Sequence, residues 1–365
     1  MNALGLTQRL NSQAKWPLHN VAQTRSIEIE AQAALPTHTL MQRAGLATAQ
    51  LALAIAPHAQ KIWLACGPGN NGGDGLEAAV HLQAWGKHPI VTWLGQDGRC
   101  PADAQQAWQR AKAAGVTLTQ QIPEQFDLAI DALLGIGAQR APEGALAQWL
   151  DALQTTAAPV LCVDIPTGLN ADTGEWLGAV KSTPTHSQRH TLSLLTLKPG
   201  LFTADGRDAS GQVWFNDLSV GNTHACTAWL QQRCTTPSHR QHNTHKGNFG
   251  DVSVIGGASG MSGAAALAAI AALHGGAGRV FAGVMDASAR LTISAAHPPL
   301  MVRAPENLNL QTSTVVCGCG GGDDIHALLP NVLSSSQQLV LDADALNAVA
   351  RDTSLQQHES KITFI

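Results

Sequence analysis

Short apolar segments alternate with segments of helical periodicity along the first 220 residues, and this alternation leaves few folds open to the chain. Helices are predicted over 40–55, 76–85, 102–114 and 145–153, and strands over 62–66, 89–94, 126–134, 159–165, 192–197 and 212–215. Strands that alternate with helices across short loops are typical of a parallel, doubly wound sheet. The sequence therefore predicts an α/β domain over residues 1–220.

A second pattern of the same kind begins near residue 246. Residues 221–245 are rich in Thr, Gln and His and show little periodicity, which favours a linker. Strands are then predicted over 252–255, 279–281, 313–316 and 338–342, with an Ala-rich helix over 262–273. The sequence thus predicts a second α/β domain over 246–365. An αβ unit of this type usually continues further, so we expect the second domain to be incomplete.

Charge and cysteine content narrow the choice of partners and compartment. The chain has 22 Lys and Arg against 26 Asp and Glu, a net charge of −4, and no run of five like charges. Nothing in this balance indicates nucleic acid or a membrane as partner, so we expect a small-molecule ligand. The seven cysteines mostly lie in apolar runs, which is typical of reduced thiols. Without a signal sequence or an apolar run of membrane-spanning length, the chain is predicted to be cytoplasmic.

A glycine-rich segment joins the first predicted strand to the helix after it. It reads Gly67-Pro68-Gly69-Asn70-Asn71-Gly72-Gly73-Asp74-Gly75. Glycines at such a junction let backbone N–H groups approach a phosphate at the N-terminus of a helix. A simple tight turn is the alternative, but the two Asn and the Asp favour a site for a polar ligand.

Three later strands also end in polar turns. These turns read Asp131-Ala132-Leu133-Leu134-Gly135-Ile136-Gly137, Val163-Asp164-Ile165-Pro166-Thr167-Gly168 and Leu197-Lys198-Pro199-Gly200-Leu201. Each could be a capped turn by itself, and Lys198 a solvated strand end. Because the carboxyl ends of parallel strands meet in one crevice, we expect these turns to form a ligand site together.

In this order and spacing, the four motifs resemble the NAD(P)H-hydrate epimerase family. The second half resembles the ADP-dependent NAD(P)H-hydrate dehydratases through residues 245–247, 255–257, 262–264 and 341–346. The tandem arrangement is similar to that of the bacterial bifunctional NAD(P)H-hydrate repair enzymes. The resemblance implies a Rossmann-like epimerase domain followed by a partial ribokinase-like domain, C-terminally truncated.

The resemblance also implies a substrate and cofactors. The substrate is hydrated NADH or NADPH, in which water has added across the 5,6 double bond of the reduced ring to give R and S forms at C6. The epimerase interconverts these forms, and the dehydratase removes water from the S form with ADP. Potassium is implied at Asn71, Asp131 and Thr167, whose oxygen donors suit an alkali ion and not zinc. A homo-oligomer is compatible with the resemblance.

Substrate-binding residues follow from the same resemblance. In the first domain they are Asn70, Asn71, Gly72, Gly73, Asp74, Gly135, Ile136, Gly137, Ala138, Gln139, Arg140, Ala141 and Asp164, and in the second Ala264 and Gly320. The chemistry independently favours Asp164 as a catalytic residue. Inverting the hydroxyl-bearing carbon requires loss and return of the hydroxyl or opening of the ring, and both routes need a group that gives and takes a proton. Lys198 is the second catalytic candidate, as a cation that polarises the site.

Some features depart from the families. Thr167 stands where the epimerases often have Ser, which keeps the hydroxyl. Gly318–Gly322 replaces the Gly-Pro-Gly-Leu-Gly loop of the dehydratases, and their catalytic Gly-x-Gly-Asp turn has no counterpart before Ile365. We therefore expect no dehydratase turnover.

Two other classes of protein are alternatives to an isomerase. A non-catalytic dinucleotide- or partner-binding protein would be favoured if Asp164 or Asn71 lay away from the crevice. An NAD-dependent dehydrogenase is disfavoured because the first βαβ unit lacks G-x-G-x-x-G with an acidic residue about 20 positions on.

Three pairs of His, Cys or Asp residues lie close together in the sequence. His186 and His190 are predicted to lie in a loop, and Cys317 and Cys319 to be strand-end thiols. Asp342 and Asp344 are predicted to share one face of a strand, where they would suit Mg²⁺ or a nucleotide.

Overall fold

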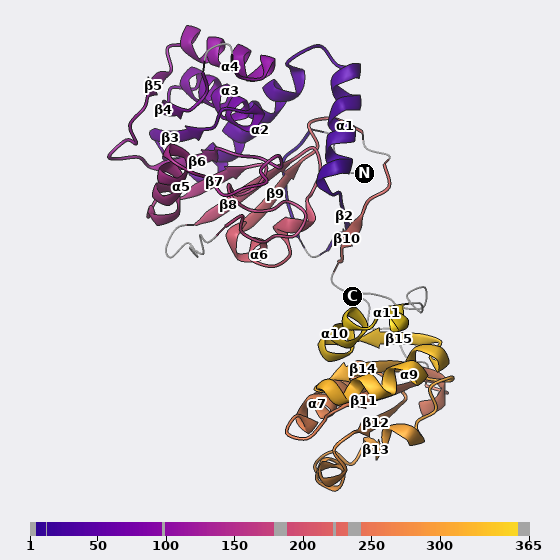
Figure 1. Ribbon diagram of the computed structural model, residues 1–365. Coiled ribbons are helices and arrows are strands. Elements are labelled where there is room, and N and C mark those ends of the chain that lie inside the picture. Colours follow the sequence, from indigo (N-terminus) through magenta and orange to yellow (C-terminus); the bar gives the residue numbers. More distant parts are fainter. Residues whose placement is uncertain are drawn as a thin grey trace. The chain divides into compact units, whose positions relative to one another are not determined.

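The computed structural model describes residues 5–11, 13–96, 99–178, 188–221, 224–232 and 242–356. The chain divides into two compact units, Met1–Thr236 and Pro237–Ile365, each with a sheet of its own (Figure 1). The division falls inside the segment 221–245 that the sequence predicts as a linker. Among the described residues, no helix has the length and apolar character needed to cross a membrane.

The first unit contains an eight-stranded sheet in the order β1-β9-β8-β7-β6-β3-β4-β5. Its strands are β1 (Gln8–Arg9), β3 (Lys61–Cys66), β4 (His88–Trp93), β5 (Thr117–Thr119), β6 (Leu128–Ala132), β7 (Val160–Val163), β8 (Arg189–Leu194) and β9 (Gln212–Asn216). All neighbours are parallel except β1, which runs antiparallel to β9. After β3 the chain adds β4 and β5 on one side of this strand. It then returns to the other side of β3 and adds β6, β7, β8 and β9 there. The direction of chain progress thus reverses between β3 and β6, where doubly wound sheets bind ligands.

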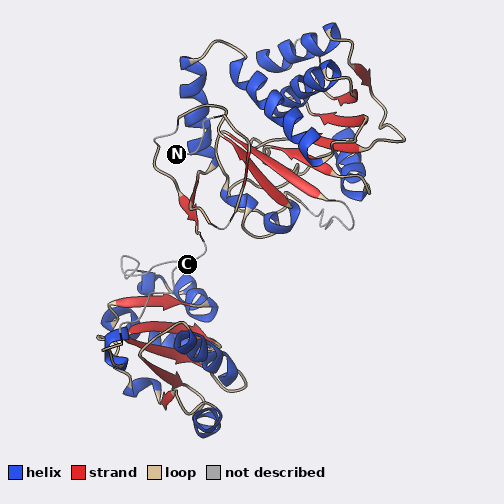
Figure 2. Cartoon of the chain, turned by 180° about the vertical axis from the view of Figure 1, so that it is seen from behind, coloured by secondary structure: helices blue, strands red, loops and turns tan. Residues whose placement is uncertain are grey.

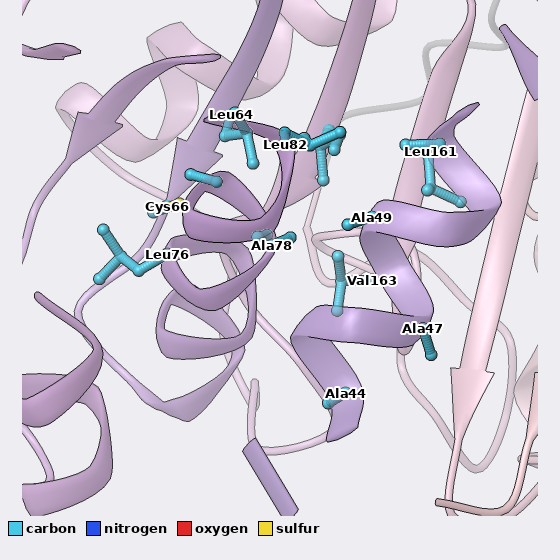
Figure 3. Packing of buried hydrophobic residues seen from close by; sticks show 14 of the residues in the cluster. Ala44, Ala47, Ala49, Leu64, Cys66, Leu76, Ala78, Leu82, Leu161 and Val163 are labelled. Atoms are coloured by element: carbon cyan, nitrogen blue, oxygen red, sulfur yellow. The ribbon is translucent and has the colours of Figure 1, made fainter. Parts of the chain in front are cut away.

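Helices cover both faces of this sheet, as Figure 2 shows. They are α1 (Val21–Ala34), α2 (Thr39–Ile55), α3 (Asn70–Ala84), α4 (Ala102–Ala113), α5 (Ala145–Thr155) and the short α6 (Gly206–Ala209). Alternate residues of a strand point to opposite faces. On β3, Leu64 therefore joins the core formed with α2, α3 and α4 (Figure 3). Trp63 joins the core formed with α5 on the other face. This arrangement confirms the predicted doubly wound α/β fold.

The glycine-rich segment is mostly helix, and the prediction that the helix begins at residue 76 is wrong. Helix α3 begins at Asn70, and Gly72, Gly73 and Gly75 lie in its first turns. A Cβ on Gly72 would stand 1.9 Å from the carbonyl oxygen of Gly67, and one on Gly75 would stand 2.7 Å from Sγ of Cys66. These glycines therefore let α3 lie close against the end of β3, and that packing outweighs their low helix propensity.

Part of the predicted linker pairs with the first unit. Strand β10 (Ala228–Leu230) is antiparallel to β2 (Trp16–Leu18) and forms a separate two-stranded sheet with it. The N–H of Thr227 also donates to the carbonyl oxygen of Leu18 at 2.9 Å. Residues 227–230 are thus held by backbone hydrogen bonds, which the polar composition of this stretch did not indicate. His190 lies on β8, and not in a loop as predicted, whereas His186 lies outside the described residues.

The second unit contains a five-stranded parallel sheet in the order β13-β12-β11-β14-β15. Its strands are β11 (Asp251–Gly256), β12 (Arg279–Val284), β13 (Met301–Arg303), β14 (Thr314–Cys319) and β15 (Gln338–Leu341), and its helices are α7 (Ser262–His274), α8 (Arg290–Ala296), α9 (Leu329–Ser335), α10 (Ala343–Arg351) and α11 (Thr353–Gln356). On β11, Val254 packs in a core with α7, and Ile255 packs in a core with α9 and α10. The unit is therefore a second α/β domain with helices on both faces.

Asp342 and Asp344 do not share a strand face, so that prediction is wrong. Strand β15 ends at Leu341, Asp342 occupies the N-cap position of α10, and Asp344 lies in its first turn. The Asp344 carboxylate accepts the backbone N–H of Gly322 at 2.9 Å. The strand-end interpretation of Cys317 and Cys319 is confirmed, because both lie in the last residues of β14.

Candidate functional site

A cavity of about 420 Å³ lies in the first unit, at the point where the sheet order reverses. The segments that follow β3, β6, β7 and β8 all contribute to its wall, together with α1, α2 and the start of α4. Its volume is typical of small-molecule sites. The cavity is therefore the crevice that the strand-end motifs predict.

Asp164 enters this cavity from the turn after β7. Its φ of +69° places it in the left-handed region, which non-glycine residues seldom occupy and which is often found at functional sites. Its N–H donates to the carbonyl oxygen of Leu192 at 2.7 Å, and its carboxylate accepts the N–H of Leu194 at 3.3 Å. Hydrogen bonds to the neighbouring strand therefore hold the carboxylate at the mouth of the sheet.

Lys198 is the cationic partner of Asp164. Its ammonium group donates to Asp164 Oδ1, to the carbonyl oxygen of Leu194 at 2.8 Å and to Oγ of Ser193 at 3.4 Å. The lysine is 0% exposed, whereas the Asp164 side chain is 14% exposed. A fully buried ammonium requires such a counter-charge. Lys198 is thus no solvated strand end, and the structure brings the two predicted catalytic residues into contact.

Asp131 and Thr167 form a second buried polar group directly beneath the loop after β6. Asp131 is 1% exposed, and its carboxylate accepts the Thr167 hydroxyl at 2.7 Å, the Thr167 N–H at 3.0 Å and the Leu133 N–H at 3.2 Å. Burial raises the pKa of Asp131, and these hydrogen bonds oppose that rise. Within the described part of the chain, Asp131 forms no ion pair with a Lys, Arg or His side chain. This buried carboxylate therefore has no cation at contact distance among the described residues, although the charge of Arg189 acts on it from further away.

Asn71 lies on the cavity side of the same loop. Its Oδ1 lies 3.4 Å from the position that a Cβ on Gly135 would occupy. Its Nδ2 is buried and makes no hydrogen bond to any residue that the structure describes. Asn71 and Asp164 both line the cavity, which is the opposite of what the non-catalytic alternative requires.

Further carboxylates make the cavity wall acidic. Asp74 of α3, Glu28 of α1 and Asp103 of α4 line it together with Asp164. Burial raises the pKa of Asp74 well above its ordinary value, and the nearby Asp164 and Glu28 carboxylates add to the rise. Burial and Asp164 likewise raise the pKa of Glu28. Asp74 and Glu28 therefore hold their protons more tightly than exposed carboxyls do.

Comparison with known proteins assigns the first unit to a family. Residues 37–200 match the model of the YjeF-related protein N-terminus, and residues 252–364 match that of the NAD(P)H-hydrate dehydratases. The NAD(P)H-hydrate epimerase of Bordetella pertussis is 39% identical over 171 residues, which are 47% of this chain and 74% of that protein. This chain belongs to the NAD(P)H-hydrate epimerase family.

Relatives of the bifunctional type are also similar to this chain. The bifunctional NAD(P)H-hydrate repair enzyme of Escherichia coli is 39% identical over 191 residues, which are 51% of this chain and 36% of that enzyme. The chain thus spans about a third of its length. Among solved structures, a yeast protein is 22% identical and covers 54% of this chain and 86% of its own, with a TM-score of 0.46. A ribokinase-like superfamily protein from Enterococcus faecalis is 26% identical and covers 35% of this chain and 48% of its own, with a TM-score of 0.31.

The substrate-binding residues predicted for the epimerase unit divide into two groups. The cavity wall contains Asn70, Asn71, Asp74, Gly135, Ile136, Gly137, Ala138 and Asp164. It does not contain Gly72, Gly73, Gln139, Arg140 or Ala141. Gly72 and Gly73 instead allow close packing. A Cβ on Gly72 would stand 1.9 Å from the carbonyl oxygen of Gly67, and one on Gly73 would stand 2.5 Å from Cε of the Met41 side chain.

The sequence does not predict that helix α1 lines the cavity of this epimerase-family chain. Arg25, Glu28 and Gln32 line the cavity and are spaced by three and four residues, so they share one helix face. The only clear signal for this helix is its capping box, in which Asn20 accepts the N–H of Gln23 at 2.9 Å.

In the second unit, the two predicted substrate-binding residues lie together. A Cβ on Gly320 would stand 2.7 Å from Cβ of Ala264. A second cavity of about 420 Å³ is lined by Gly322, Asp323, His326, Asp344, Asn347, Ala348 and Arg351. Neither Ala264 nor Gly320 belongs to that lining.

Proposed function

We propose that the first unit interconverts the R and S forms of hydrated NADH or NADPH. The observation that carries this proposal is the Asp164 carboxylate, which lies in the family's cavity with a left-handed backbone and a fully buried lysine at its side. Epimerisation at C6 needs a proton given and taken near the C6 oxygen, whether the hydroxyl leaves and returns or the ring opens. Asp164 moves that proton.

Lys198 positions Asp164 and stabilises its negative charge. The ammonium group is hydrogen-bonded to Oδ1 and is itself anchored by Leu194 and Ser193, so the carboxylate has little freedom to rotate. A base whose orientation is fixed by a second group is the usual arrangement at proton-transfer sites. The second oxygen, Oδ2, is then the atom that faces the substrate.

Asp131, Thr167 and Asn71 would hold a potassium ion in this proposal. All three offer hard oxygen donors, which suit an alkali cation. The buried Asp131 carboxylate has no ion-pair partner at contact distance among the described side chains, so a bound cation would supply a direct counter-charge beside the more distant Arg189. The ion would fix the loop after β6, on which Leu134 and Gly135 line the cavity. Its contribution is structural order and charge balance at the substrate site.

The second unit is proposed to act in the ADP-dependent removal of water from the S form, because residues 252–364 match the dehydratase model. ADP is the nucleotide that the family resemblance implies. Incubation of the purified chain with the S form and ADP, followed as regenerated NADH, tests this proposal. Regeneration of NADH no faster than in a no-enzyme control would refute it.

The epimerase proposal is tested from both directions. The purified chain is mixed with the pure R form or with the pure S form, and the ratio of the two forms is followed by chromatography against a no-enzyme control. An isomerase must bring both mixtures to the same final ratio, faster than the control. If either mixture approaches the final ratio no faster than the no-enzyme control, the proposal is refuted.

A further inference from the structure

The cavity of the proposed epimerase contains two cationic side chains, Arg25 of α1 and Lys198. Lys198 is committed to Asp164, and it is completely buried. Arg25 is exposed, and among the described residues its guanidinium forms neither an ion pair nor a hydrogen bond. Arg25 is therefore the cation on this wall that remains available to a ligand.

Arg25 lies against the glycine-containing loop after β6. A Cβ on Gly137 would stand 3.4 Å from Nη2 of Arg25, and a Cβ on Gly135 would stand 3.4 Å from Oδ1 of Asn71. The loop thus passes between the start of α3 and the guanidinium of α1. Both glycines line the cavity and carry no side chain, so the backbone beside Arg25 is open to an approaching group.

The rest of the wall is acidic and would repel an anion. Asp103 and Asp164 line the same cavity, and the carboxyls of Glu28 and Asp74, whose pKa values are raised, also offer an anion no positive charge. A negatively charged part of a ligand is therefore favoured only near a cation. Arg25 lies one helical turn before Glu28, and its charge lowers the pKa of Glu28 against the larger effect of burial. The positive potential of the cavity is therefore concentrated at the edge where α1 meets Gly137.

We propose that Arg25 binds the diphosphate of the hydrated dinucleotide against Gly137, an inference that rests on the proposed function. A guanidinium offers parallel N–H donors that match two phosphate oxygens, which an ammonium cannot do. Arg25 is a binding residue in this account, and no proton transfer depends on it. The diphosphate lies at the α1 edge, and the reduced ring extends from there toward Asp164.

The test compares Arg25→Gln and Arg25→Lys with the native chain. Arg207→Gln on α6 is the matched control, because Arg207 is an exposed arginine of the same unit outside the cavity. Calorimetry measures the binding of ADP-ribose, which contains a diphosphate, and of adenosine, which does not. Arg25→Gln is expected to weaken ADP-ribose by about tenfold or more, as hydrogen bonds to charged groups do, with adenosine unchanged. The affinity of Arg25→Lys for ADP-ribose should lie between that of the native chain and that of Arg25→Gln. The affinity of Arg207→Gln should equal that of the native chain.

Three results would overturn the inference. They are unchanged ADP-ribose affinity in Arg25→Gln, equal weakening of ADP-ribose and adenosine, and no binding of ADP-ribose to the native chain. The conversion assay separates this inference from the proposed function. If the native chain converts the hydrates and Arg25→Gln has the same KM, the inference fails and the function stands. If the native chain converts nothing but binds ADP-ribose through Arg25, the function fails and the diphosphate site stands.

Discussion

Breaking the buried pair between Lys198 and Asp164 is expected to destabilise the first unit more than removing both charges. In Asp164→Asn the ammonium stays buried without a counter-charge, because its remaining partners are neutral oxygens: the Leu194 carbonyl, the Ser193 hydroxyl and the amide oxygen at position 164. Loss of one member of a buried pair costs about 3–5 kcal/mol. Because the Asp164 side chain is 14% exposed and water can reach it, we expect the lower end, about 3 kcal/mol. Asn tolerates the left-handed backbone, so the change does not strain the turn.

The double variant Asp164→Asn/Lys198→Met removes the charge that Asp164→Asn leaves unpaired. Met fills most of the aliphatic volume of Lys198. The losses are the ammonium's hydrogen bonds to neutral oxygens, about 1 kcal/mol each, and the gain is removal of an uncompensated buried charge, whose cost with its lost contacts is about 3–5 kcal/mol. The double variant should therefore be more stable than Asp164→Asn. Urea unfolding followed by tryptophan fluorescence measures this, because all nine Trp precede residue 237 and report on the first unit.

Asp151→Asn is the matched control, since Asp151 is exposed on α5 and lies outside the cavity. It should change the free energy of unfolding by less than about 0.5 kcal/mol. The reasoning is refuted if Asp164→Asn costs no more than this control. It is also refuted if the double variant is as unstable as Asp164→Asn, because the penalty would then not come from an uncompensated charge on Lys198.

Three further outcomes are expected. Gly72→Ala should lower the free energy of unfolding by about 1–3 kcal/mol because the added Cβ would meet a backbone oxygen at 1.9 Å, whereas the control Gly69→Ala, where the Cβ has open space, should leave it nearly unchanged. Equal losses of stability for the two variants in urea unfolding would contradict this packing. The free energy of unfolding should fall as the pH rises above 3.8, the ordinary Asp pKa, because burial raises the pKa of Asp74 and the folded state then binds more protons than the unfolded state. Asp74→Asn should make this fall less steep, and an unchanged slope would contradict the role of Asp74. Exchange of potassium for lithium should weaken binding of the hydrated cofactor more in the native chain than in Asp131→Asn, and equal sensitivity would remove the ion from the account.

The sequence predicts the sheet well because its central strands are short, apolar and bounded by polar turns. Ile62, Leu64 and Cys66 on β3 are completely buried, so hydrophobicity alone marks the strand. The topology rule for parallel sheets then predicts that the turns after β3, β6 and β7 meet, and Asn71 and Asp164 do lie on one cavity wall. The convergence of the site therefore follows from the order of the elements and needs no knowledge of side-chain contacts.

Features that depend on packing between distant segments escape such reasoning. Glycine has low helix propensity, so the segment from Asn70 to Gly75 resembles a turn until its packing against Gly67 and Cys66 is known. Helix α1 buries only Thr24, Ile27 and Ala31, which leaves a weak periodic signal. Its approach to the cavity is tertiary information, and Arg25 could not be predicted as a lining residue.

The central claim is that Asp164 moves the proton in the conversion of the R hydrate to the S hydrate. The decisive measurement is the rate of this conversion in the native chain, in Asp164→Asn and in Asp151→Asn, each corrected for the reaction without protein. We expect a loss of at least about 10²-fold for Asp164→Asn and a native rate for Asp151→Asn. Native-rate conversion by an Asp164→Asn protein that is folded by its tryptophan fluorescence would contradict the account.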